Sequence, residues 1–577
     1  MTAPSNIAAI LPKMAAERGS QVAMRCPGRH RRNAPAPYDV EITYAQLDAR
    51  SDAIAKGLAT LGIVRGLRTV LMVRPSPEFF LLMFALFKIG AVPVLVDPGI
   101  DRRALKQCLD EAQPQAFIGI PLAHAARRLL GWAKSARIHV TVGRRWWWRG
   151  STLARVEALG AGAGSQLIDT AADDVAAILF TSGSTGIPKG VVYRHRHFGA
   201  QIAMLRDAFG IQAGGVDLPT FPPFALFDPA LGLTSIIPDM DPTRPARADP
   251  RKLHAAIARF GVSQLFGSPA LVGVLARHGA RLPTVRRVLS AGAPVPPETV
   301  AAIRELLPAD AQLWTPYGAT ECLPVAVIEG RELQCTRAAT ENGAGTCVGR
   351  PVSPNVVRII RIGDEAISRW TDDLLVEPGQ VGEISVAGPT VTDAYFNRPQ
   401  ATALAKINEI LADGSQRVVH RMGDVGYFDA DGRLWFCGRK AHRVQAGEGV
   451  LFTEQVEPVF NTHPDVRRTA LVGIDVADGI ASRPTDHAAH SQHIVPLLCV
   501  ELNEGVRSSQ RARIVEELRA IGARQPHTAP IAHFAFHPGF PVDIRHNAKI
   551  GRETLAAWAA KRDHRQWAAN AGANIVR

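Results

Sequence analysis

Cysteine is scarce in this chain, and the few cysteines present form no recognisable pattern. The 577 residues contain seven cysteines, and no two of them make a Cys-x-x-Cys pair. A structural zinc site or a disulfide framework needs regular spacing of this kind, so we expect neither. Helix-turn-helix, zinc-finger and RNA-binding signatures are missing too. We therefore expect no nucleic-acid partner, and we interpret the net charge of +13 as an arginine-rich composition that also suits an anionic substrate.

We expect neither a targeting signal nor a membrane-spanning segment. Residues 1–20 contain no basic start followed by a long apolar core, so a secretory signal is not expected. One apolar run, Phe79 to Val96, approaches membrane-spanning length, but a lysine, a glycine and a proline interrupt it. This composition predicts a buried helix followed by a strand. The chain is therefore expected in the reducing cytoplasm.

The length and the hydrophobic patterning predict an α/β protein with more than one domain. A chain of 577 residues is too long for a single hydrophobic core. Strand and helix patterns alternate in the first third, which predicts parallel sheets covered by helices. The pattern then changes to short strands and turns, with a hairpin predicted at Asp431-Gly432, and the last part alternates again. The expected strands are 67–73, 91–96, 117–120, 175–180, 191–193, 427–428, 434–436, 470–472 and 495–500, and the expected helices are 77–89 and 511–521.

One ten-residue segment, Thr181 to Gly190, carries the strongest functional signal. It reads Thr-Ser-Gly-Ser-Thr-Gly-Ile-Pro-Lys-Gly and joins two predicted strands. Glycines let backbone N–H groups approach an anion, and the hydroxyls and Lys189 add donors and a positive charge suited to a polyphosphate. It is not a Walker A loop, because Lys189 is not preceded by glycine and followed by serine or threonine. A flexible polar hairpin is the plain alternative. The candidate phosphate-binding residues are Thr181, Ser182, Gly183, Ser184, Thr185, Gly186 and Lys189.

This segment resembles the signature loop of the adenylate-forming superfamily, which includes acyl-CoA synthetases, luciferases and peptide-synthetase adenylation domains. Further motifs follow in the family's order and cover most of the chain. The resemblance implies an α/β fold with a large N-terminal domain of stacked mixed sheets, helices and a small β-barrel-like part (1–438). A small mobile α+β domain (439–577) would follow. The motifs are Ser290–Pro294 for the adenine pocket, Tyr317–Glu321 as the second core motif, Gly423–Asp424 for ribose, Gly438–Lys440 as the hinge, and Lys549.

The resemblance implies an enzyme that uses ATP and Mg²⁺ to activate a carboxylate. The carboxylate joins the α-phosphate and pyrophosphate leaves, so the site must hold two anions in line with positive charge. Lys549 would bridge the carboxylate and α-phosphate oxygens, and Glu321 with Thr185 would hold Mg²⁺, which prefers oxygen ligands. With Lys189, these residues form the expected catalytic set. The other expected nucleotide contacts are Gly292, Ala293, Pro294, Tyr317, Gly318, Ala319, Thr320, Asp424 and Arg439, and Lys440 is the expected hinge.

Each of these residues also has a plain structural interpretation. Tyr317 is a flat ring suited to stacking on adenine, but its motif alone is also typical of a turn that leads into a helix. Asp424 can accept both ribose hydroxyls, but aspartate is common in turns. Arg439 and Lys549 taken alone would be solvated surface charges. The order of the motifs along the chain favours the functional interpretation.

The family's acyl-pocket region corresponds to Pro222–Gly232. Phe224, Phe227 and Leu231 could line an apolar tunnel for a long chain together with Gly318, with core packing as the alternative. Asp228 is similar to the aspartate that binds an amino group in peptide-synthetase adenylation domains, although the residues after it match that group poorly.

A narrower resemblance rests on this region together with Pro238–Pro245 and Leu434–Val444. These segments are similar to the bacterial olefin β-lactone synthetases. The resemblance implies a long-chain 2-alkyl-3-hydroxy acid whose own 3-hydroxyl attacks the activated acyl carbon and releases AMP and a β-lactone. It also implies assembly with a thiolase, a reductase and a lactone decarboxylase. Gln445 stands where many acyl-CoA ligases have lysine, and this difference argues against a second step that uses CoA.

Three alternatives stay open at this stage. A long-chain acyl-CoA ligase would share the activation step and then use CoA. An amino-acid-activating domain would use Asp228. An adenylate-binding protein without catalysis is disfavoured, because Lys549, Glu321 and Asp424 are all present.

The segment Arg144–Arg149, which reads Arg-Arg-Trp-Trp-Trp-Arg, has no counterpart in the superfamily motifs. Three consecutive tryptophans flanked by arginines are typical of a membrane-interface or partner-binding loop. Burial in an irregular insertion is the alternative, since tryptophan is mostly buried on average. We expect the loop at Trp146–Trp148 to help receive an apolar substrate.

Overall fold

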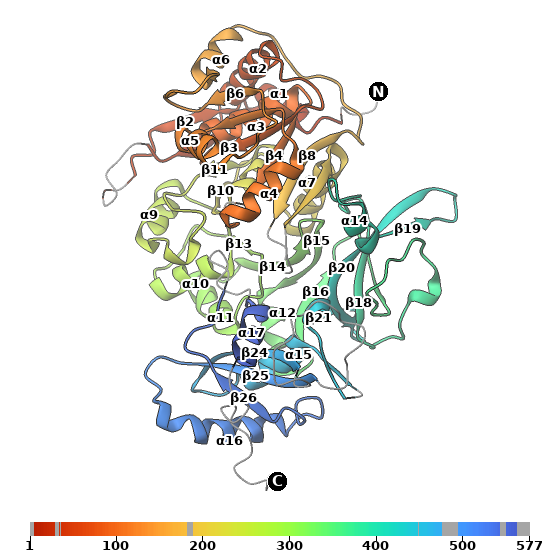
Figure 1. Ribbon diagram of the computed structural model, residues 1–577. Helices are drawn as coiled ribbons and strands as arrows, with labels where there is room; N and C mark the ends of the chain where they lie inside the picture. The colour runs from red at the N-terminus through yellow and green to blue at the C-terminus, as the bar shows by residue number, and fades with distance from the viewer. Residues whose placement is uncertain are drawn as a thin grey trace.

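The computed structural model of the protein describes residues 5–28, 34, 36–97, 99–181, 188–447, 449–475, 494–542 and 550–561. In Figure 1 two large sheets with their helices fill the upper and middle parts, and the blue C-terminal helices and strands lie below them. None of the helices in the described ranges combines the length and apolar character that a bilayer crossing requires.

Seven of the described strands form a mostly parallel sheet early in the chain. Their order is β7-β6-β5-β3-β4-β8-β9, and the β8–β9 pair is antiparallel. Residues Phe79–Phe87 of helix α3 are all buried, as a helix that is apolar all round requires. The long apolar run is therefore α3 followed by β4, as predicted. The elements are α1 (Ile10–Arg18), α2 (Tyr44–Thr60), β3 (Arg68–Met72), α3 (Pro77–Lys88), β4 (Val92–Val96), α4 (Arg102–Ala112), β5 (Ala116–Gly119), α5 (Pro121–Leu130), β6 (Ile138–Thr141), β7 (Ser151–Thr152), α6 (Leu153–Leu159), β8 (Val175–Thr181) and β9 (Lys189–Arg194).

A second sheet has fourteen of the described strands and changes character along its length. Neighbouring strands are parallel in the part of the sheet with the order β1-β11-β10-β12-β13-β14. Strand β15 pairs with β14 in the antiparallel direction, and the strand pairs beyond β15 are antiparallel too. Helices α9, α10 and α11 pack on its parallel part around a second apolar core. The elements of this part are β1 (Val22–Cys26), β2 (Val40–Thr43), α7 (His195–Phe209), β10 (Val216–Pro219), α8 (Asp228–Leu231), β11 (Thr234–Ile236), α9 (Pro250–Phe260), β12 (Gln264–Gly267), α10 (Pro269–His278), β13 (Arg287–Ser290), α11 (Pro297–Leu306), β14 (Gln312–Ala319), β15 (Cys322–Glu329), α12 (Gly330–Cys335) and α13 (Arg337–Glu341).

The barrel-like part that the resemblance implied corresponds to strands β16–β21. They continue the second sheet in the order β17-β18-β20-β21-β16, and β19 pairs with β20. Within the described ranges β17 does not pair back to β16, so these strands form an open antiparallel sheet rather than a closed barrel. The hairpin predicted at Asp431-Gly432 joins β20 to β21 and is confirmed. The bounds are β16 (Thr346–Pro351), β17 (Val356–Ile360), β18 (Gly382–Ala387), α14 (Pro399–Ala405), β19 (Lys406–Ile410), β20 (Gln416–Phe428) and β21 (Leu434–Arg439).

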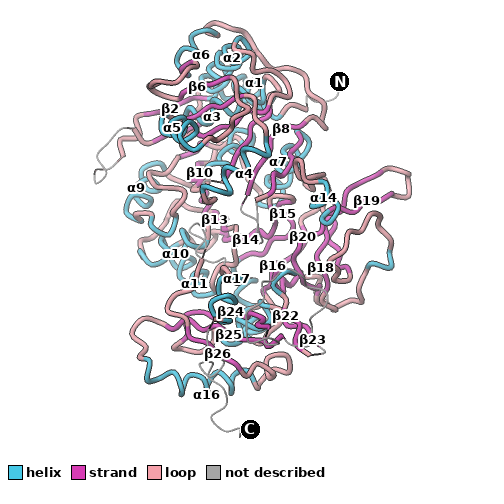
Figure 2. Tube along the Cα trace, in the orientation of Figure 1, coloured by secondary structure: helices cyan, strands magenta, loops and turns pink. Residues whose placement is uncertain are grey.

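The residues after β21 form smaller sheets with their own apolar clusters. Strands β24, β25 and β26 form a three-stranded sheet, and helix α16 packs on it through Ile514, Val515 and Leu518. Figure 2 shows this α+β unit below the large sheets. The predicted strands at 470–472 and 495–500 and the helix at 511–521 are confirmed; the domain division at 438 and 439 stays a prediction. The elements are β22 (Val444–Ala446), β23 (Gly449–Leu451), α15 (Thr453–Phe460), β24 (Val466–Asp475), β25 (Ile494–Leu502), α16 (Arg511–Gly522), β26 (His533–Phe536) and α17 (Arg552–Ala560).

Candidate functional site

A cavity of about 1450 Å³ lies where the parallel strands of both large sheets end. Its lining includes the residues directly after β3, β4 and β5 in the first sheet and after β10, β12 and β13 in the second. Ligands of α/β proteins bind at the carboxyl ends of strands, where loops rather than sheet residues meet the ligand. The cavity is therefore the candidate active site.

The second core motif forms a tight hairpin rather than the start of a helix. Strand β14 ends at Ala319 and β15 begins at Cys322, so Thr320 and Glu321 occupy the tip of the hairpin. Both line the cavity, with Tyr317, Gly318 and Ala319. The hydroxyl of Tyr193 donates to the Thr320 carbonyl and helps to fix the tip.

Tyr317, Asp424 and Arg439 meet at the cavity, which Tyr317 and Arg439 line. The Tyr317 hydroxyl donates a 2.6 Å hydrogen bond to Oδ2 of Asp424, and Arg439 Nη1 lies 2.8 Å from Oδ1. Asp424 and Arg439 are opposite each other in the β20–β21 ladder, which explains their ion pair. Burial and the neighbouring Asp424 carboxylate raise the pKa of Tyr317 well above its ordinary value. The predicted ribose and adenine residues are therefore in contact.

Glu321 is held by a residue that the sequence analysis did not single out. The Tyr395 hydroxyl donates a 2.6 Å hydrogen bond to Glu321 Oε1, and Lys189 Nζ lies 5.0 Å from the Tyr395 ring centroid. Burial alone would raise the pKa of Glu321, but His420, the Tyr395 hydroxyl and Lys406 together lower it. An ionised carboxylate at a cavity wall fits Mg²⁺, which is bound through one or two carboxylates and phosphate oxygens.

Lys406 and His420 are the other functional candidates that the sequence analysis missed. They face each other in the β19–β20 ladder. Lys406 is 7% exposed, donates to Thr392 Oγ1 at 3.4 Å, and has its pKa lowered to about 8 by burial. Burial and Lys406 lower the pKa of His420 to about 3, so this imidazole is neutral at pH 7. Nothing in the local sequence distinguishes either residue, because only the strand register brings them next to Glu321.

The adenine-pocket segment lies at the cavity only in part. Gly292 lines the cavity with a φ of 101°, a left-handed conformation that favours glycine. Ala293 and Pro294 are not among the lining residues.

The predicted acyl-pocket residues divide into two groups. Phe224 and Phe227 line the cavity, and Phe224 stacks on Phe266 with ring centroids 3.9 Å apart. Leu231 instead packs in the core with Leu205 and Leu289.

Asp228 is also away from the lining, at 2% exposure. It accepts a hydrogen bond from the Ser235 hydroxyl and shares its site with Asp217. Burial raises the pKa of Asp228 to about 7. The short helix α8 buries the side chains of Asp228 and Leu231 outside the cavity lining, and their contact with substrate stays a prediction.

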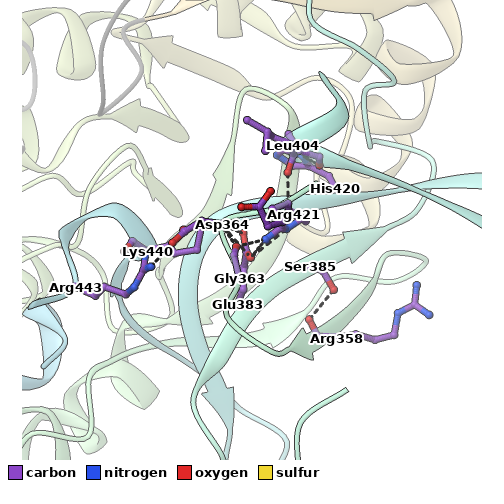
Figure 3. A network of polar contacts seen from close by, with 12 residues as sticks. Arg358, Gly363, Asp364, Glu383, Ser385, Leu404, His420, Arg421, Lys440 and Arg443 are labelled. Carbon is purple, nitrogen blue, oxygen red and sulfur yellow. Dashed lines mark hydrogen bonds and ion pairs between the residues drawn. The ribbon is translucent and has the colours of Figure 1, made fainter. Parts of the chain in front are cut away.

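The expected hinge residue, Lys440, is bound into a network of buried charges (Figure 3). Its ammonium donates to the Gly363 carbonyl at 2.7 Å and to Glu383 at 3.2 Å. Arg421 donates to the same carboxylate at 2.6 and 3.0 Å. Glu383 is 1% exposed, so one buried carboxylate forms ion pairs with two cations, Lys440 and Arg421.

Several predicted residues cannot be placed. Ser182, Gly183, Ser184, Thr185, Gly186 and Lys549 lie outside the described residues. The Thr181 backbone pairs with Lys189 at the end of the β8–β9 hairpin, next to the cavity lining.

Known proteins resemble this chain in amino-acid sequence and in fold. The family described as AMP-binding enzyme matches residues 22–396. The olefin beta-lactone synthetases of Xanthomonas campestris and Stenotrophomonas maltophilia are 70% and 69% identical over 561 residues, which covers 97% of this chain and 98% and 99% of theirs.

Solved structures show the same fold at lower identity. The amide bond synthetase McbA from Marinactinospora thermotolerans superposes with a TM-score of 0.74 at 23% identity, over 96% of this chain and 99% of its own. ATP-bound MatB from Rhodopseudomonas palustris gives 0.73 at 19%, over 97% and 99%. The predicted resemblance is thus confirmed. The chain belongs to the AMP-binding enzyme family and is an adenylate-forming ligase or synthetase.

Proposed function

We propose that the enzyme activates a long-chain 2-alkyl-3-hydroxy acid with ATP and then closes it to a β-lactone. First, a carboxylate oxygen attacks the α-phosphorus, a new P–O bond forms, and pyrophosphate leaves. Then the 3-hydroxyl oxygen attacks the acyl carbon, the bond from that carbon to AMP breaks, and the hydroxyl proton leaves with AMP. Intramolecular attack needs no second substrate, and holding the acid folded supplies the entropic advantage.

The shape of the cavity is the observation that carries this proposal. Successive residues of a strand point to opposite faces of a sheet. On β8, Ile178 and Phe180 belong to one apolar cluster, and Ala177 and Leu179 to the cluster on the other face. The cavity is lined from both faces, so it passes over the carboxyl edge of the first sheet.

Each face contributes apolar residues to the cavity. One side consists of Leu105, Ile120, Ala123, Ala126 and Trp132 from the α4 and α5 regions. The other side consists of Phe79, Met83, Phe84 and Phe87 from α3. An acid with two alkyl branches would place one branch on each side, whereas a straight-chain acid would fill one. The relatives named olefin beta-lactone synthetases support the same substrate class.

The proposed nucleotide and metal contacts follow the motifs. Tyr317, Thr320, Asp424 and Arg439 would bind the nucleotide together with Lys189 and the segment from Thr181 to Gly186. Glu321 and Thr185 would hold Mg²⁺, which would offset phosphate charge. Lys549 would complete the charge balance from the small domain (439–577), with Lys440 as its hinge to the large domain (1–438).

Product analysis tests the proposal. The purified enzyme is given ATP, Mg²⁺ and a 2-alkyl-3-hydroxy acid, with and without CoA, and the products are identified by NMR. We expect a β-lactone, AMP and pyrophosphate without CoA. The matched control is the 2-alkyl acid without the 3-hydroxyl, which should support ATP–pyrophosphate exchange and give no lactone. A thioester that forms only with CoA would overturn the proposal and favour an acyl-CoA ligase.

A further inference from the structure

The segment 121–150 combines strong positive charge with exposed apolar side chains. It contains seven lysines and arginines and no aspartate or glutamate. Several of its large apolar residues are open to solvent: Leu129 is 80% exposed, Trp147 is 66%, Leu122 is 64% and Trp146 is 47%. Adjacent exposed apolar groups on a soluble domain usually mark an interaction site. We define the basic–apolar face by Leu122, Leu129, Trp146, Trp147, Arg128, Arg144, Arg145 and Arg149.

The tryptophan loop is held in place by its buried member. Trp148 is 3% exposed, stacks on His124 of α5 with ring centroids 5.2 Å apart, and donates from Nε1 to Thr141 Oγ1 at 2.9 Å. Trp146 and Trp147 stack on each other above this anchor. The alternative of burial in an irregular insertion therefore applies to Trp148 alone, and the loop presents the indoles of Trp146 and Trp147 to solvent.

The face lies at a mouth of the active-site cavity. Leu122 follows β5, and the tryptophan loop follows β6, its parallel neighbour in the sheet. Both segments therefore leave the same edge of the sheet, where adjacent strands are about 5 Å apart. Leu122 also lines the cavity beside Ala123 and Ala126, so one exposed residue connects the face to the apolar interior.

Charge complementarity defines what would bind here. Among the described residues, no carboxylate forms an ion pair with Arg144, Arg145 or Arg149. Indole rings favour the headgroup level of a bilayer, and arginines favour anionic headgroups. An apolar long-chain acid dissolves in the same bilayer.

We propose that the basic–apolar face docks on an anionic lipid surface, and that the apolar substrate passes from the bilayer past Leu122 into the cavity. Trp146 and Trp147 insert at the headgroup level, while the arginines contact phosphate groups. The proposal concerns delivery of an apolar acid and does not depend on lactone formation.

Vesicle sedimentation tests the docking directly, using the full chain without ATP. Vesicles of phosphatidylcholine are compared with vesicles that also contain phosphatidylglycerol, at low and high NaCl. The variants are Trp146→Ser/Trp147→Ser and Arg144→Gln/Arg149→Gln, which leave the Trp148 anchor intact. The matched control is Val64→Ser/Arg277→Gln, which changes an exposed valine and an exposed arginine outside the face. Circular dichroism checks that each variant folds.

We expect binding to the anionic vesicles only, weakened by salt, with a blue shift of tryptophan fluorescence. Each face variant should bind about tenfold more weakly or worse, and the control should bind like the wild type. Turnover of vesicle-embedded acid should fall in both face variants, while turnover of detergent-dispersed acid should not change. Equal binding of wild type and face variants, equal binding to neutral vesicles, or capture by polyglutamate without vesicle binding would overturn the proposal.

Discussion

The hydroxyl of Tyr395 donates a 2.6 Å hydrogen bond to Glu321, a residue 74 positions earlier in the chain. An isolated antiparallel β-bridge between the backbones of Val191 and Tyr395 brings the tyrosine to the cavity. This bond is one of the interactions that lower the pKa of Glu321 against the effect of burial.

Replacing Tyr395 with phenylalanine should therefore raise the pKa of Glu321. A raised pKa leaves more of the carboxyl protonated on the acid side, so activity should begin to fall at a higher pH than in the wild type. On the acid side kcat/KM should therefore be lower in the variant than in the wild type, and the difference should narrow as the pH rises and the carboxyl ionises in both. The pH profile of pyrophosphate release measures this. Tyr427→Phe, which removes a hydroxyl bonded to Ala344, is the control and should leave the profile unchanged.

Lys406 should impose an alkaline limit on the same reaction. Its pKa is lowered to about 8, so it carries a positive charge beside Glu321 below that pH and loses it above. We expect the wild-type rate of ATP–pyrophosphate exchange to fall as the pH rises through about 8. Lys406→Met should be slower at pH 7 and lack that decline. An unchanged alkaline limb in this variant would assign the titration to another group.

The sequence predicted the residues that belong to contiguous motifs, and missed those that depend on strand register. Tyr317, Asp424 and Arg439 could be identified because each lies in a recognisable segment, and the ladder then joins them. Tyr395 and Lys406 carry no local signal, since they reach Glu321 through pairings between distant segments.

The buried surroundings of Asp228 were missed for a related reason. Its motif position suggested a substrate contact, but burial of α8 against Asp217 could not be inferred from local pattern. The alternation of strand and helix patterns predicted the fold more reliably than a single motif predicted the surroundings of one residue, because parallel sheets impose this alternation over long stretches of sequence.

Asp228→Asn should stabilise the protein at alkaline pH without loss of activity. The folded-state pKa of about 7 lies above the ordinary value, so the fold favours the protonated carboxyl. Its stabilising contribution is complete at low pH and is lost as the pH rises through 7. Asparagine cannot ionise, so the free energy of unfolding at pH 8 should increase by about 4 kcal/mol, from a pKa difference of about 3 units. Urea unfolding at pH 5 and pH 8 measures this; loss of activity in the variant would instead support an amine-binding role for Asp228.

The network around Glu383 should respond unequally to loss of its members. Glu383→Gln leaves Arg421 buried at 3% exposure without its counter-ion, and should cost about 3–5 kcal/mol of stability. Lys440→Met leaves the Arg421–Glu383 pair intact and should cost clearly less. Urea unfolding of both variants measures which substitution lowers the free energy of unfolding more. The reverse order would mean that Lys440, rather than Arg421, is the main partner of the carboxylate.

Oxygen labelling tests the central claim most directly. The 2-alkyl-3-hydroxy acid is prepared with ¹⁸O either in the carboxylate or in the 3-hydroxyl, and the AMP and lactone are analysed by mass spectrometry. Activation of the carboxylate predicts that AMP gains one label from the carboxylate and none from the hydroxyl, which stays in the lactone ring. AMP labelled from the 3-hydroxyl, or unlabelled from the carboxylate, would contradict the account.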